Sequence, residues 1–108
     1  MKGQGHHHVY VVLLDAAVMK HRPFIDQNPN LAPDTMCLYV GMTGTGPEER
    51  FADHKAGYKA NSYVKRYGVR LMPELYERLN PMTYDEALAT EARLADELRS
   101  AGYAVWQR

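Results

Sequence analysis

Three segments of the chain have the apolar patterns of β-strands. Val9 to Leu14 is an uninterrupted apolar run rich in β-branched residues, which is typical of a strand covered on both faces. Leu38 to Val40 is a shorter run that ends at Gly41 and a cluster of small, turn-forming residues. A third strand is predicted between Val69 and Leu79, and Pro73 within it places that strand at an edge of the sheet.

Two helices are predicted between the second and third of these segments. Pro47 suits the first position of a helix, and the two glutamates that follow it suit the positive end of the helix dipole. Gly57 breaks this helix. Asn61, or the serine after it, is suited to cap a shorter helix that ends at Gly68.

The longest predicted helix begins at a capping box, Thr83 to Glu86, and ends at Gly102. Its apolar residues recur three and four positions apart, and Glu91 falls within that stripe. A carboxylate on the face that packs against a sheet needs a cation, a hydrogen-bond donor or a metal ion as its partner. The pattern alone leaves two roles equally open, a salt bridge with Arg50 and a metal ligand. The predicted stripe comprises Tyr84, Ala87, Leu88, Glu91, Leu94, Ala95 and Leu98.

These elements predict one α/β (α+β) domain, a small three-stranded sheet flanked by helices. We expect residues 1–8 to form a disordered tail, whose three histidines are either native or the remnant of a tag, and residues 9–108 to form the domain. Residues 15–36 contain three prolines and only scattered apolar positions. We expect them to form an irregular insertion after one or two helical turns.

Charge is balanced over the whole chain but not along it. The 108 residues include 13 basic and 13 acidic ones, so net charge predicts neither a nucleic acid nor an acidic surface as the partner. Residues 50–70, however, hold six Lys and Arg against one acid. Such a segment is either a footprint for a phosphate backbone or a solvated helix face.

A single cysteine, Cys37, excludes an internal disulfide and a cysteine-based zinc site, and its place beside a strand predicts a small buried side chain. No apolar run approaches the roughly 20 residues that span a bilayer, and no signal-peptide pattern opens the chain. We therefore expect a cytoplasmic protein that does not bind a membrane.

Arg50 and His54 lie four residues apart on one predicted helix face, just beyond the strand that carries Tyr39. Val9-Tyr10-Val11, Tyr39-Val40-Gly41, Arg50, His54 and Glu91 follow one another in an order and spacing that resembles the GIY-YIG nuclease domain. The resemblance extends from Val9 to the end of the last helix.

The resemblance implies a metal-dependent endonuclease that hydrolyses phosphodiester bonds of nucleic acid, DNA in preference to RNA. Glu91 would hold one divalent cation, Mg²⁺ or Mn²⁺, and Tyr10 or Tyr39 would accept or orient the proton of the attacking water. Arg50 would neutralise charge on the phosphate, and His54 would donate a hydrogen bond or shuttle the proton. The residues expected to contact the nucleic acid are Gly41, Lys55, Lys59, Lys65 and Arg66.

The chain departs from the family pattern in two places. Twenty-eight residues separate Tyr10 from Tyr39, where the family usually has a much shorter hairpin, and the asparagine that family members often carry near the C-terminus has only Gln107 as a substitute. Two other functions therefore stay open. One is a weakly active or inactive module of the same fold that binds nucleic acid or a protein, and the other is a phosphoesterase that acts on a small nucleotide. Oligomeric state and the role of the insertion are also open.

Overall fold

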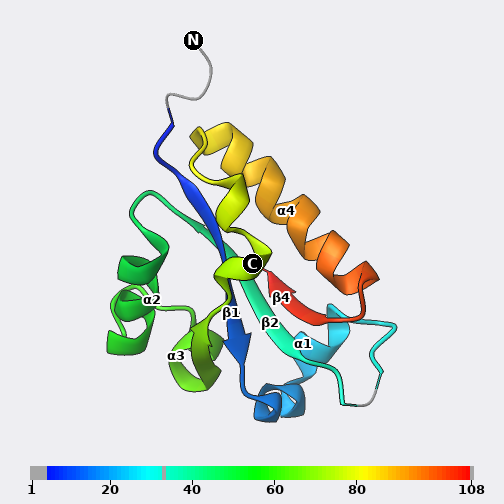
Figure 1. Cartoon of the computed structure of the whole chain (residues 1–108). Coiled ribbons are helices and arrows are strands. Elements are labelled where there is room, and N and C mark those ends of the chain that lie inside the picture. Colours follow the sequence, from blue (N-terminus) through cyan, green and yellow to red (C-terminus); the bar gives the residue numbers. More distant parts are fainter. Residues whose placement is uncertain (1–4, 33, 108) are drawn as a thin grey trace.

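The computed structural model describes residues 5–32 and 34–107 and contains one mixed sheet, in the strand order β3-β1-β2-β4 (Figure 1). β1 pairs antiparallel with β2 on one side and with β3 on the other, whereas β4 pairs parallel with β2. The strands are β1 (His8–Leu14), β2 (Cys37–Thr43), β3 (Gly68–Leu71) and β4 (Ala104–Gln107).

The sheet has one strand more than predicted. β4 is the C-terminal segment, and its Val105 is fully buried. β3 is an edge strand as Pro73 indicated, but it ends at Leu71. The rest of the predicted third strand forms two 3-10 helices, Pro73–Leu75 and Glu77–Leu79, because proline at the first position favours a helical turn.

Helices lie on both sides of the two tyrosine-bearing strands. In Figure 1, α2 and α3 lie on one side of β1 and β2, and α4 lies on the other. The structure confirms the predicted caps: Gly57 ends α2 with φ 88°, the Asn61 side chain caps α3, and Thr83 forms the capping box of α4. The α-helices are α1 (Arg22–Asp26), α2 (Pro47–Ala56), α3 (Ser62–Tyr67) and α4 (Tyr84–Ser100).

The predicted stripe of α4 is confirmed at Ala87, Leu94, Ala95 and Leu98, which are buried, and wrong at two positions near the start of the helix. Tyr84 and Leu88 are about half exposed, at 54% and 50%, because α4 contacts the rest of the protein through a narrower face. Glu91 lies one turn from both Ala87 and Ala95 and is partly exposed. The buried residues of the helix are Ala87, Thr90, Leu94, Ala95 and Leu98.

The insertion at residues 15–36 is more regular than expected. It contains a 3-10 helix, Ala16–Lys20, followed by α1, and the two residues after α1 bind β4. The amide of Gln27 bonds to the backbone N–H and C=O of Gln107. The buried amide of Asn28 bonds in the same way to Val105, so two side chains take the place of a neighbouring strand along β4.

The N-terminal strand begins earlier than predicted. β1 starts at His8, and His7 pairs with Met82 through both backbone hydrogen bonds. Residues 1–4 of the predicted tail lie outside the described residues. Cys37 is buried, as expected, and no helix within residues 5–32 and 34–107 has the length and apolar character to cross a membrane.

Candidate active site

Tyr10 and Tyr39 lie side by side on one face of the sheet. Tyr39 pairs with Val12 across the β1–β2 ladder, and Val12 points to the same face as Tyr10 because strand side chains alternate. The two ring centroids are 6.0 Å apart. Both rings are buried, with 1% of Tyr10 and 5% of Tyr39 exposed, so the site is a packed cluster with little access to bulk water.

Gly41 makes room for this pair. It is the β2 partner of Tyr10, and a Cβ atom at this position would lie 2.7 Å from Tyr39 Cε2 and 2.8 Å from Tyr10 Oη. Such distances are too short for carbon, so any side chain would displace the tyrosines. The sequence predicted that Gly41 contacts the nucleic acid; the structure shows in addition that its missing side chain makes room for the two rings.

His54 connects the tyrosines to the start of α3. Its Nε2 lies 2.8 Å from the Tyr10 hydroxyl, and its Nδ1 accepts a hydrogen bond of 3.0 Å from the backbone N–H of Asn61. Burial, together with the nearby Arg50 charge, lowers the pKa of His54 to about 4. The neutral ring therefore carries its proton on Nε2 and donates it to the oxygen of Tyr10.

The Tyr10 hydroxyl itself keeps its proton at neutral pH. Burial raises the pKa of Tyr10 well above its ordinary value, and so do the charge of Tyr39 and the hydrogen bond to Tyr39. Hydrogen bonds thus lead from the Asn61 N–H through His54 to the oxygen of Tyr10, whose ring lies against that of Tyr39.

Two charged residues act on the same hydroxyl. The Arg50 charge lowers the pKa of Tyr10 and the Glu91 charge raises it, so both side chains lie within electrostatic range of the cluster. Of the five residues that the sequence picked out as catalytic, Tyr10, Tyr39 and His54 are in contact, and Arg50 and Glu91 lie within electrostatic range of Tyr10.

Arg50 also has a structural contact that the sequence did not reveal. Its two terminal nitrogens donate hydrogen bonds to the backbone oxygens of Tyr58 (3.2 Å) and Lys59 (2.7 Å). These bonds use two of the five N–H donors of a guanidinium group. The loop that follows α2 is thereby attached to the site.

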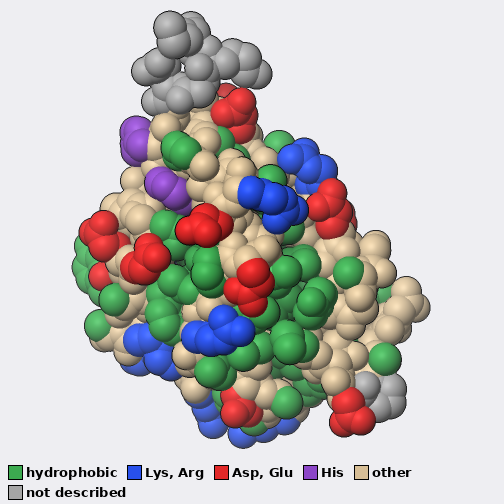
Figure 2. Space-filling view, viewed as in Figure 1, with side chains coloured by type: hydrophobic (Ala, Val, Ile, Leu, Met, Phe, Trp, Pro, Cys, Tyr) green, Lys and Arg blue, Asp and Glu red, His purple; other side chains and the backbone are tan. Residues whose placement is uncertain are grey.

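The predicted nucleic-acid contacts surround this loop and α3. Lys59, Lys65 and Arg66 are exposed. Lys55 is exposed too, but its ammonium group donates to the backbone oxygens of Lys65 and Gly68 at the end of α3. In Figure 2, basic side chains lie in the lower part of the view, around and below the position of α3 in Figure 1, and acidic side chains lie higher, at the level of α2.

Metal ligands are sparse in the described part of the chain. Within residues 5–32 and 34–107, no three His, Cys, Asp or Glu side chains come together in a group that could hold a metal ion. A single carboxylate completed by water and phosphate oxygens is nevertheless an arrangement that Mg²⁺ accepts. Glu91, whose charge acts on Tyr10, could supply that carboxylate.

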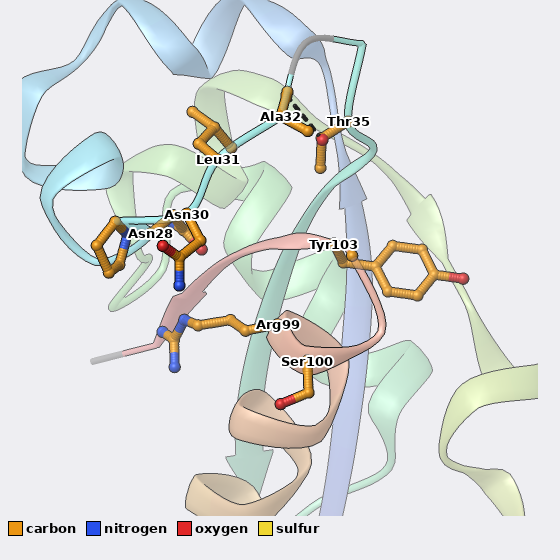
Figure 3. Close-up of a pocket in the computed structure, with 10 residues that line it drawn as sticks. Asn28, Asn30, Leu31, Ala32, Thr35, Arg99, Ser100 and Tyr103 are labelled. Atoms are coloured by element: carbon orange, nitrogen blue, oxygen red, sulfur yellow. Dashed lines mark hydrogen bonds between the residues drawn. The ribbon is translucent and has the colours of Figure 1, made fainter.

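Two hollows of the surface lie away from the tyrosines. One, of about 220 Å³, is enclosed by the insertion and the C-terminal end of α4, with Arg99 along one side and the ring of Tyr103 pointing away (Figure 3). Another, of about 280 Å³, lies between His8, Glu48 and Tyr76. Burial and the charges of nearby glutamates, Glu48 first, raise the pKa of Tyr76 to about 12. Neither hollow includes Tyr10 or Tyr39.

Comparison of the chain with protein-family models, with curated proteins and with solved structures found no match.

Proposed function

We propose that the protein is a metal-dependent nuclease of the GIY-YIG type that hydrolyses phosphodiester bonds of nucleic acid, DNA in the first place. The observation that carries this proposal is the buried hydrogen-bond chain from Asn61 through His54 to Tyr10, which lies against the ring of Tyr39. A purely structural tyrosine pair needs no buried neutral imidazole and no nearby charges of both signs. A phosphate site that moves a proton uses all of these groups.

Tyr39 is the better base of the two tyrosines. Burial raises the pKa of Tyr10 well above its ordinary value, so Tyr10 stays protonated and is a poor base. In the proposed reaction, the oxygen of a water molecule bonds to phosphorus and its proton passes to the Tyr39 phenolate. The bond from phosphorus to the leaving ester oxygen then breaks. Tyr10 and His54 pack against the Tyr39 ring and hold it in position.

Arg50 and Glu91 supply the charges. The Arg50 guanidinium neutralises the charge that builds on the phosphate. It does so through N–H groups other than the two that bind the loop carbonyls. Glu91 would hold a single Mg²⁺ or Mn²⁺ ion. When bound, such an ion polarises the phosphate and stabilises the leaving oxygen.

A nucleic-acid substrate is supported by the position of the basic surface. Lys59 belongs to the loop that Arg50 holds, and Lys65 and Arg66 lie on the helix that follows. A chain of phosphates that passes the site can therefore meet several cations in succession, which a small nucleotide would not reach.

Burial of the tyrosines favours one alternative. With 1% and 5% of their surfaces exposed, Tyr10 and Tyr39 admit little water, and a protein with this site closed would bind nucleic acid without cutting it. The binding module is therefore the second candidate function.

Cleavage of labelled DNA and RNA in Mg²⁺, Mn²⁺ and chelator separates the two functions. We expect metal-dependent cleavage that falls at least 100-fold in Tyr39→Phe and in Glu91→Ala. Glu97→Ala is the matched control, because it removes an exposed carboxylate from the same helix, and it should retain wild-type activity. Salt-sensitive binding with no cleavage by any of the proteins would reject the nuclease and leave the binding module.

A further inference from the structure

The loop between α2 and α3, residues 57–61, is attached to the candidate active site at both ends. Arg50 binds the carbonyls of Tyr58 and Lys59, and the backbone N–H of Asn61 binds His54. The two residues that hold the loop are thus two of the five proposed catalytic residues. Any group that the loop presents is placed at a fixed distance from the site.

The loop presents an aromatic ring to solvent. Tyr58 is 59% exposed, and the Lys59 ammonium lies 5.5 Å from the centroid of its ring. Lys59 has φ 45°, in the left-handed region, which strains the backbone of a residue with a side chain. Backbone strain of this kind persists where the surroundings maintain it and is concentrated at functional sites. Here the surroundings are the hydrogen bonds from Arg50.

We propose that Tyr58 is a platform on which an unpaired nucleobase of the substrate stacks, while Lys59 contacts the neighbouring phosphate. This inference rests on the proposed function and names its substrate class: a nucleic acid with a single-stranded or branched segment beside the cleaved bond. Every base has a flat face, so an exposed ring binds unpaired nucleotides of any sequence. Bases inside a duplex are already stacked and gain nothing from the ring.

The test measures binding in the presence of chelator, so that no cleavage is needed. The probe is a single-stranded DNA oligonucleotide that contains 2-aminopurine, whose fluorescence is quenched by stacking, and the comparison is a duplex of the same sequence. We expect Tyr58→Ala to weaken single-strand binding at least fivefold and to abolish the quenching. Tyr58→Phe should keep both, since the ring remains.

Tyr84→Ala is the matched control, because Tyr84 is a tyrosine of similar exposure, 54%, on α4. It should change neither affinity nor quenching. If the wild type binds the single strand but Tyr58→Ala binds equally well with equal quenching, the platform is rejected and the proposed function stands. If the wild type binds none of the probes, both proposals are rejected.

Discussion

Gly41 shows how one missing side chain determines the geometry of the tyrosine pair. A methyl group here would meet Tyr39 Cε2 at 2.7 Å and Tyr10 Oη at 2.8 Å. Two buried rings cannot both move aside without disturbing His54. We therefore predict that Gly41→Ala lowers the free energy of unfolding by about 1–3 kcal/mol, the usual cost of overpacking. Urea denaturation measures this free energy. Gly44→Ala is the control, because a Cβ atom at Gly44 would lie 3.4 Å from its nearest neighbour, an atom of His7. An equal effect of both substitutions would contradict the packing argument.

His54 makes stability depend on pH. Its pKa is about 4 in the folded protein and near 6.5 in an unfolded chain, because the buried ring resists protonation. Between these values the unfolded state binds more protons, so the free energy of unfolding decreases as the pH falls. We predict a loss of about 3 kcal/mol from pH 6.5 to pH 4.

Chemical denaturation at several pH values checks this prediction against His54→Gln. The variant lacks the titrating group, and its free energy of unfolding should change less over the same range. Carboxylates that titrate near pH 4 affect both proteins equally. Parallel curves for the two proteins would show that the imidazole is not held neutral.

At the scale of elements, the insertion explains how a short parallel strand is kept in place. β4 pairs with β2 on one edge, and the amides of Gln27 and Asn28 bind its backbone beyond that pairing. Arg99 adds a bond from α4 to the Val105 carbonyl. The insertion therefore protects an edge that would otherwise be open to another strand.

Asn28→Ala should weaken this arrangement. The substitution removes a buried amide and leaves the N–H of Val105 without its partner, at a cost of about 1–3 kcal/mol. We expect a lower free energy of unfolding and faster hydrogen exchange at the Val105 amide, with Asn30→Ala, an exposed neighbour, as control. Unchanged exchange at Val105 would show that pairing with β2 alone holds the strand.

At the scale of the whole molecule, local chemistry was predictable and long-range pairing was not. The caps at Gly57, Asn61 and Thr83 follow from residues only a few positions apart, and the structure confirms them. β4 becomes the fourth strand because it pairs with β2, which lies more than 60 residues earlier in the sequence. No short sequence pattern predicts a pairing over that distance. The attachment of the 57–61 loop to Arg50 was not predictable either. The residue of that loop with a left-handed backbone is Lys59, and lysine is not a residue type that indicates a turn.

The asymmetric distribution of charge permits a final prediction, on salt dependence. If the phosphate backbone of a nucleic acid runs along α3, replacing Lys65 and Arg66 by serine removes two phosphate contacts. The slope of log affinity for DNA against log salt concentration should then become less steep by about two. Arg78→Ser with Arg93→Ser removes the same charge from exposed positions on other elements and should leave the slope as it is. Because both double variants have the same net charge, an equal change in slope would mean that the whole molecule's charge, and not the surface beside the tyrosine cluster, attracts the nucleic acid.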